Sequence, residues 1–319
     1  MVEGLGWGTE WIIDLQASGS ALLTQAMNAF TFLGSELFYL LVMPAVLWCV
    51  NASLGVRLGL ALLTSVGLNS LLKLAFGLPR PYWVDSRVRA LTIETSYGLP
   101  SGHAQNAVVL WGYLAVQLRR WWVTALMVVL ILAISFSRVY LGVHFPSDVV
   151  SGWLIGALLL VAFVRLEGPV TDWFAKHTLR VRLVAAGFGS FSLTALGWIA
   201  ARATSERVIP AEWIENILRE TGSGFNAQSP EGVISAGGAL FGFSLGAVLL
   251  TDWGKFHGAG GMGPRLARFF FGLVGVLALH LGLSALLPDG EAFRFLRYAL
   301  VGFWIAYGAP RAFVALRLA

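Results

Sequence analysis

Nine long apolar stretches constrain the fold of this 319-residue chain more than any other feature of its sequence. An α-helix needs about 20 apolar residues to cross the hydrocarbon of a bilayer. Only 12% of the residues are charged, against roughly 25% in typical soluble domains. The sequence therefore predicts an all-α, polytopic transmembrane bundle of about nine spans, the first of which has room to begin earlier. These spans are expected at residues 35–50, 54–76, 102–118, 121–141, 147–166, 181–201, 232–251, 267–287 and 293–316.

The chain is predicted to divide once, at a connecting segment formed by residues 167–180. Residues 1–34 mix polar and apolar side chains, so we expect helices that lie in the membrane interface. Residues 35–166 would form a core of five spans, and residues 181–319 a second bundle of four. All the chemically informative motifs fall in the core.

Glycines spaced four apart indicate close helix packing in both predicted bundles. Gly152 and Gly156 share one face of the fifth span, and Gly238, Gly242 and Gly246 share one face of the seventh. Small residues at this spacing let two helix backbones approach closely. We therefore interpret these glycines as packing positions.

The distribution of basic residues predicts which side of the membrane each loop faces. In a nine-span bundle, 12 of the 22 Lys and Arg residues fall on the side of the C-terminus and 10 on the opposite side. Three of those 10 belong to the motifs described below, which leaves 7. The positive-inside rule then places the C-terminal side in the cytoplasm, and the motifs face a periplasm or lumen across a cytoplasmic (inner) membrane. The net charge of +5 needs no nucleic acid partner, because the basic residues border the spans.

The first motif joins two cations at the end of the second span. Lys73 is followed, after six residues, by Arg80 and Pro81. An arginine suits a phosphate because its planar guanidinium donates two parallel hydrogen bonds, while lysine acts as a point charge. Basic residues also reach toward the interface from helix ends, so this pair alone leaves a structural role open.

The second motif is Pro100-Ser101-Gly102-His103, directly before an apolar helix. Serine is a favoured N-cap, and the amides at a helix N-terminus form an anion site that the helix dipole strengthens. A histidine at this place can exchange protons with a bound group. A plain capping role for Ser101 and a structural role for His103 remain alternatives.

The third motif runs from Ser137-Arg138 at the end of the fourth span to Asp148 at the start of the fifth. His144 and Asp148 are four residues apart. The carboxylate can accept a hydrogen bond from one imidazole nitrogen and leave the other as a nucleophile. A structural ion pair at the helix start would fit this segment alone equally well.

Taken together, Lys73-x6-Arg80-Pro81, Pro100-Ser101-Gly102-His103 and Ser137-Arg138-x5-His144-x3-Asp148 resemble the three-part signature of the type 2 phosphatidic acid phosphatase superfamily. The likeness covers roughly residues 20–166. The family includes lipid phosphate phosphatases, prenyl diphosphate phosphatases, glucose-6-phosphatase and vanadium haloperoxidases. The four C-terminal spans lie outside the core and make this chain similar to the longer, nine-span members.

The resemblance implies a role for each motif residue. His144 would attack phosphorus and form a phosphohistidine, with Asp148 holding its tautomer. His103 would protonate the leaving oxygen and then take a proton from water. The phosphate would be bound by Lys73, Arg80 and Arg138, and by the amides around Ser101 and Gly102. Because these cations supply the positive charge, no metal and no cofactor are expected.

We therefore interpret the chain as an integral membrane phosphatase that hydrolyses a lipid phosphate or diphosphate. The loop from Tyr82 to Leu99 is the expected substrate lid, with Tyr82 and Trp83 as its candidate contacts. A lipid phosphotransferase, a phosphatase of a soluble sugar phosphate, a haloperoxidase and a non-enzymatic lipid transporter are the alternatives. The sequence identifies neither the lipid nor the oligomeric state.

Overall fold

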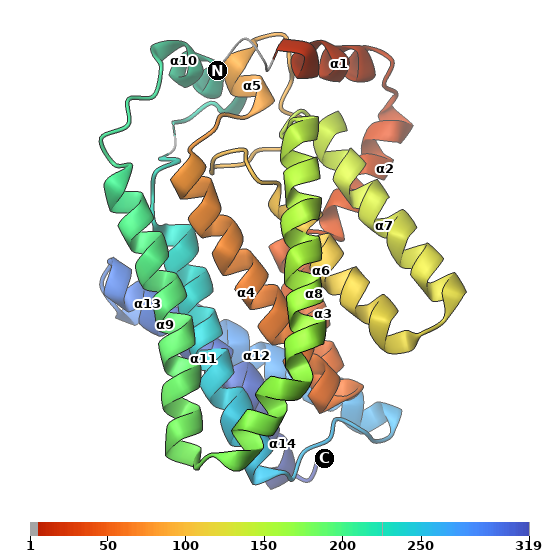
Figure 1. The fold of residues 1–319 in the computed structure, drawn as a ribbon, viewed down its shortest axis with the longest axis vertical. Helices are drawn as coiled ribbons and strands as arrows, with labels where there is room; N and C mark the ends of the chain where they lie inside the picture. Colours follow the sequence, from red (N-terminus) through yellow and green to blue (C-terminus); the bar gives the residue numbers. More distant parts are fainter. Residues whose placement is uncertain (1–5, 225, 319) are drawn as a thin grey trace. The chain divides into compact units, whose positions relative to one another are not determined.

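The computed structural model describes residues 6–224 and 226–318, and all regular structure in those residues is helical (Figure 1). The all-α prediction is confirmed. The helices are α1 (Gly6–Ala17), α2 (Ala21–Phe32), α3 (Glu36–Cys49), α4 (Ala52–Phe76), α5 (Pro81–Val84), α6 (Gly102–Leu118), α7 (Trp121–Tyr140), α8 (Pro146–Lys176), α9 (Leu179–Ala203), α10 (Ala211–Thr221), α11 (Glu231–Trp253), α12 (Met262–Leu286), α13 (Glu291–Phe303) and α14 (Ala309–Ala315), with a π-helical turn, η2, at Trp304–Gly308.

One of two compact units combines the N-terminal residues through Phe38 with Leu71–Val161 and Ile199–Ser229. It holds α1, α2, α5, α6, α7 and α10, together with the end of α4 and the first half of α8. Its buried core contains Tyr82 and Tyr97 beside residues 139–145. The core thus includes loops and helix ends, and the three motifs lie in these parts of the unit.

The other unit combines Tyr39–Ser70, Ala162–Trp198 and Pro230–Ala319. Within it, α11 packs closely on α13, because Gly238 faces the Phe295 carbonyl and Gly242 faces the Ala299 carbonyl. A Cβ at either glycine would collide with that oxygen. The packing interpretation of these glycines is confirmed.

The two units interleave along the sequence, whereas the sequence prediction cuts the chain once, at residues 167–180. Part of the reason is that α8 and α9 each contribute residues to both units. The predicted division into an N-terminal segment, a five-span core and a four-span bundle stays a prediction.

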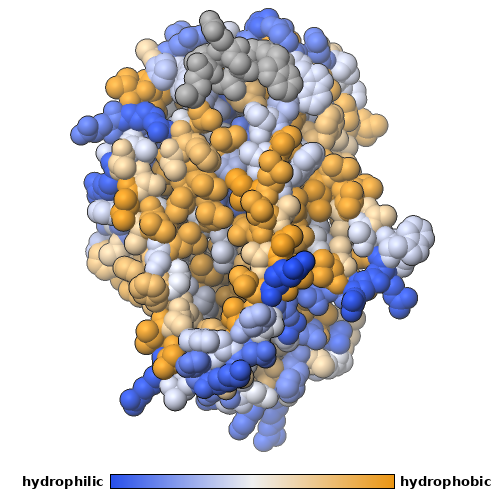
Figure 2. All heavy atoms as spheres, in the orientation of Figure 1, coloured by the Kyte–Doolittle hydropathy of each residue, from blue (hydrophilic) through white to orange (hydrophobic). Residues whose placement is uncertain are grey.

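Within the residues that the structure describes, six helical segments are long and apolar enough to cross a membrane: Ala52–Val84, which contains α4, and the helices α7, α8, α9, α11 and α12. A seventh arises if α2 and α3, which meet at a bend of 48°, form one broken span. Many of their exposed side chains are apolar (Figure 2), as a lipid environment requires. The chain is thus a multi-pass membrane protein.

The predicted count of nine spans stays a prediction. Each of the nine apolar stretches is helical, but α6 has 17 residues and falls just short of the expected length. The last stretch is divided among α13, η2 and α14. The first, α3, has 14 residues with Pro44 inside it, which removes one helical hydrogen bond.

Candidate active site

The three motifs meet where four helices of the first unit end or begin. Lys73 lies near the C-terminal end of α4 and Arg138 near that of α7, while His103 is in the first turn of α6 and Asp148 in that of α8. The Ser101 amide donates a 2.9 Å hydrogen bond to the Asp148 carbonyl oxygen. This backbone contact ties the second motif to the third.

Two glycines of α8 allow this approach. Gly152 lies against the carbonyl of Ser101, the N-cap residue of α6, and Gly156 lies against the carbonyl of Gln105 within α6. A Cβ at either position would come within 2.7 Å of the facing oxygen, which real side chains do not tolerate. The packing role predicted for these glycines is confirmed, and it draws the start of α8 onto the start of α6.

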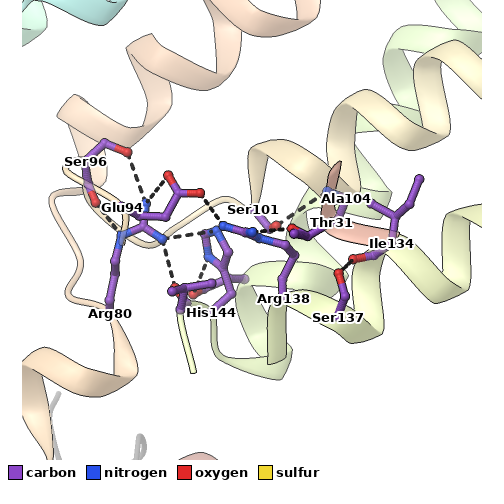
Figure 3. Close-up of polar contacts among 12 residues, drawn as sticks. Thr31, Arg80, Glu94, Ser96, Ser101, Ala104, Ile134, Ser137, Arg138 and His144 are labelled. Atoms are coloured by element: carbon purple, nitrogen blue, oxygen red, sulfur yellow. Dashed lines mark hydrogen bonds and ion pairs between the residues drawn. The ribbon is translucent and has the colours of Figure 1, made fainter. Parts of the chain in front are cut away.

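Lys73 and Arg80 are buried and bind the same stretch of the loop before α6. Figure 3 shows Arg80 beside Ser96 of this loop. The Lys73 Nζ donates to the Tyr97 carbonyl at 2.6 Å and to the Ser96 hydroxyl at 3.2 Å. The Arg80 Nε donates to the Ser96 carbonyl at 2.6 Å, and its Nη1 donates to the Val143 carbonyl at 2.9 Å. Arg80 therefore connects this loop to the turn that carries His144.

Arg138 is the third buried cation, and it reaches two partners outside the predicted motifs. Its Nη1 donates to the Thr31 hydroxyl, and its Nη2 forms an ion pair with the Glu94 carboxylate. Its Nε is buried and has no hydrogen-bond partner within the part of the chain that the structure describes. A buried donor without an acceptor is costly, so this atom is suited to an incoming oxygen ligand.

His144 lies between an acceptor and a donor. Its Nδ1 is 3.2 Å from the Asp148 Oδ2, and its Nε2 is 3.3 Å from the Arg80 Nη1. Because arginine only donates, Nε2 must carry the lone pair, and the proton must lie on Nδ1 facing Asp148. The Phe145 amide also donates to the Asp148 Oδ2 at 2.9 Å, which fixes the carboxylate.

Charge and burial keep His144 neutral. Burial lowers the pKa of the His144 imidazole well below its usual value, and the positive charges of Arg80 and Lys73 lower it further. The imidazole is therefore neutral at neutral pH, with its proton on Nδ1 and the Nε2 lone pair available for nucleophilic attack. The pairing of His144 with Asp148 that the spacing predicted is present.

The second motif supplies a helix N-terminus and a partly buried histidine. The Ser101 hydroxyl caps α6 by accepting a 3.5 Å hydrogen bond from the Ala104 amide. The Ser101 amide is already used by the Asp148 carbonyl. Gly102 begins the helix, where an amide has no intrahelical acceptor. His103 packs against Gly34, at the turn between α2 and α3.

Tyr82 and Trp83 are fully buried rather than exposed on a loop. They form α5, with Pro81 in its first turn, and their rings contact each other edge to face at 6.3 Å. The Tyr82 hydroxyl donates to the Glu94 carbonyl at 2.9 Å. The two side chains thus pack against the loop before α6, since the Trp83 ring also contacts that of Tyr97. The suggestion that they form a substrate lid stays a prediction.

Glu94 is the most informative residue that sequence reasoning missed. Its two carboxylate oxygens face two different arginines, Arg138 and Arg80, and the second lies 3.7 Å away. Burial alone would raise the pKa of the Glu94 carboxyl, but the two arginines hold it well below its usual range. The sequence did hold a signal for such a partner, because Asp85 and Glu94 are the two acidic residues between the first and second motifs and so the nearest candidates to pair with the buried cations. Asp85 pairs with Arg87, two residues away.

Helix α10 was also not foreseen as part of this region. The Asn216 side chain donates to the Trp83 carbonyl at 2.9 Å, and the Glu220 carboxylate accepts from the Ala90 amide at 2.9 Å. The Trp213 ring packs 6.4 Å from that of Trp83. A helix from far along the sequence therefore holds both α5 and the loop that follows it.

Comparison with known families agrees with this arrangement. Residues 54–171 match the model of the PAP2 superfamily, and residues 234–319 match that of the PAP2 superfamily phosphatase, transmembrane extension. The chain belongs to the PAP2 superfamily. The resemblance to type 2 phosphatidic acid phosphatases is confirmed. Helix α10 lies between the two matched regions, so this PAP2 domain is held in part by a segment that neither model covers.

Several characterised proteins are similar to this PAP2 chain. A probable sphingosine-1-phosphate phosphatase of Dictyostelium discoideum is 28% identical over 47% of this chain and 40% of its own length. Lipid phosphate phosphatase delta of Arabidopsis thaliana is 28% identical over 53% and 44%. An undecaprenyl-diphosphatase of Sulfolobus acidocaldarius is 27% identical over 53% and 83%. The chain thus spans less than half the length of the first two relatives.

Proposed function

We propose that this protein is an integral membrane phosphatase that hydrolyses a lipid phosphate or diphosphate through a phosphohistidine on His144. The observation that carries the proposal is the position of the neutral His144 Nε2 beside buried cations, with Asp148 on its other nitrogen. Membership of the PAP2 superfamily supports the same reaction class.

In the first half of the reaction, the His144 Nε2 attacks phosphorus and forms the N–P bond, while the bond to the leaving oxygen breaks. His103 gives that oxygen a proton. As the N–P bond forms, the His144 ring becomes positively charged, and the Asp148 carboxylate stabilises it through the Nδ1 proton. Negative charge on the phosphoryl oxygens is stabilised by the cationic side chains.

In the second half, water attacks the phosphohistidine, the N–P bond breaks, and inorganic phosphate leaves. His103, now neutral, takes a proton from the attacking water and so returns to its starting state. Arg80, Arg138 and Lys73 hold the phosphoryl oxygens in both halves, and the unpaired Arg138 Nε is a ready donor for one of them. The Gly102 amide at the start of α6 adds a further donor.

The substrate is proposed to be a lipid because the cations lie at the ends of long apolar helices. A headgroup could enter the site there while its acyl or prenyl chain stays in the bilayer. The similar proteins include a probable sphingosine-1-phosphate phosphatase and an undecaprenyl-diphosphatase, so both a monophosphate and a diphosphate are reasonable substrates.

A phosphate-release assay tests this function directly. We expect the purified protein to release inorganic phosphate from at least one amphiphilic phosphate, in excess chelator and with inhibition by vanadate. Vanadate adopts the five-coordinate geometry of the transition state. The screen should cover sphingoid-base phosphate, phosphatidate, phosphatidylglycerophosphate, a lipid A phosphate, undecaprenyl diphosphate and a sugar phosphate. Activity that vanishes in chelator and returns with magnesium would contradict the proposed mechanism.

We further propose that the site faces away from the cytoplasm, across an inner membrane. The support is the excess of basic residues on the opposite side of the membrane. In a Cys49→Ser background, Ser86→Cys should react with a membrane-impermeant thiol reagent in intact spheroplasts. His257→Cys, at an exposed position predicted to be cytoplasmic, should react only after permeabilisation. The reverse pattern would place the site in the cytoplasm.

A further inference from the structure

Glu94 occupies the space between two of the cations that are proposed to bind phosphate. Its Oε1 pairs with the Arg138 Nη2, and its Oε2 lies 3.7 Å from the Arg80 Nη2. Figure 3 shows the carboxylate between the two arginines. A phosphoryl group bound by both arginines would present two of its oxygens in the same way, because carboxylate and phosphate use the same guanidinium geometry.

The Glu94 carboxylate and a bound phosphoryl group would compete for the same two arginines. Glu94 pairs with the same two guanidinium groups, those of Arg80 and Arg138, that the proposed mechanism assigns to the phosphoryl oxygens. Placing a carboxylate and a phosphate side by side in a buried site would also bring two like charges together, which is unfavourable at low dielectric. Binding of the substrate's phosphate therefore requires the carboxylate to leave.

The surroundings of Glu94 allow its side chain to move without unfolding the loop. The Glu94 carbonyl is held separately by the Tyr82 hydroxyl at 2.9 Å, and the neighbouring Ser96 and Tyr97 carbonyls are held by Arg80 and Lys73. The Glu94 side chain is 28% exposed, whereas that of Arg138 is only 2% exposed. The backbone is thus fixed, while the Glu94 side chain is partly open to solvent.

We propose that the Glu94 carboxylate is a built-in competitor for the phosphate site, displaced each time an anion binds. The proposal rests on the assignment of Arg80 and Arg138 as phosphate ligands. In this account, the apparent affinity for an anion equals the intrinsic affinity reduced by the fraction of molecules in which the carboxylate has left the arginines. The same competition helps to expel inorganic phosphate after hydrolysis.

Direct binding of inorganic phosphate tests this competition, with turnover measured separately. We expect Glu94→Gln to bind phosphate about tenfold or more tightly than the wild-type protein in titration calorimetry. A neutral amide competes less well for a guanidinium than a carboxylate does, because charge-assisted hydrogen bonds are roughly twice as strong. The matched control is Glu10→Gln, which removes an exposed carboxylate paired with Arg87. It should leave the affinity for phosphate unchanged.

Unchanged or weaker phosphate binding by Glu94→Gln would overturn the proposal. If that variant does not fold in detergent, Glu94→Asp serves instead, because its shorter side chain reaches the arginines less well and should give a smaller gain in affinity. A protein that binds phosphate more tightly after these substitutions, yet hydrolyses no lipid phosphate in its wild-type form, would refute the proposed enzymatic function and leave the competition intact.

Discussion

Replacing His144 with Ala is expected to abolish turnover of every phosphate ester that this protein hydrolyses, by on the order of 10⁵-fold or more. Losses of this size follow the removal of a nucleophile in other covalent mechanisms. The expected loss is independent of the leaving group, because without the Nε2 lone pair the N–P bond cannot form with any substrate. Steady-state phosphate release from a good and a poor leaving group, measured on the same preparation, checks this.

Two controls separate loss of the nucleophile from loss of the fold. His257→Ala removes an exposed histidine outside the candidate site and should retain full activity. His144→Ala should still bind inorganic phosphate, because Arg80, Arg138 and Lys73 are untouched. Substantial hydrolysis by His144→Ala would mean that another group attacks phosphorus.

Replacing His103 with Ala is expected to slow the hydrolysis of a lipid phosphate by about 10² to 10⁴-fold, which is the usual contribution of general acid–base catalysis. The effect on the first step should depend on the leaving group. An alkoxide needs a proton to depart, whereas a nitrophenolate leaves readily as an anion. His103→Ala should therefore still form phosphoenzyme from a nitrophenyl phosphate that reaches the site.

Hydrolysis of the phosphohistidine, the second step, should distinguish His103→Ala from other inactive variants. Without His103 to take a proton from water, the phosphohistidine should break down slowly, so a burst of nitrophenol should precede a slow steady state. Rapid-mixing measurements of nitrophenol release would detect that burst. Equal slowing with both kinds of leaving group, and no burst, would require a different role for His103.

The motif residues could be predicted because their contacts depend on local spacing along a helix or at its end. They do not depend on how distant parts of the chain fold. A histidine and an aspartate four residues apart at a helix start can form a hydrogen bond, and His144 and Asp148 do so. Cations at the ends of apolar helices need anionic or polar partners, and Lys73, Arg80 and Arg138 are all buried together with such partners.

The partners themselves could not be predicted, because they depend on how loops fold. Glu94 has no fixed spacing from either arginine that it pairs with, and Thr31 reaches Arg138 from α2, more than 100 residues earlier in the chain. The contact of Asn216 with the Trp83 carbonyl joins segments 133 residues apart. Tertiary packing decides such pairs, and no local pattern encodes them.

The helices were predicted more closely than the spans. Hydropathy located all nine apolar helical stretches, but it could not show that α8 continues as a helix to Lys176 through Pro169, beyond the expected end at residue 166. Nor could it show that the last stretch is interrupted by a π-helical turn. Hydropathy detects the apolar character of a segment, while its length and continuity depend on neighbouring helices.

Identification of the phosphorylated residue tests the central claim most directly. The protein would be mixed with a ³²P-labelled lipid phosphate that it hydrolyses, quenched in base within one turnover, digested and analysed by mass spectrometry. The account predicts phosphate on the peptide that contains His144, on its imidazole, with the label stable in base and lost in acid. The label should be absent from His144→Ala, and it should accumulate in His103→Ala when a labelled nitrophenyl phosphate replaces the lipid phosphate. Label on another residue, or none in any variant while the wild-type protein turns over, would contradict it.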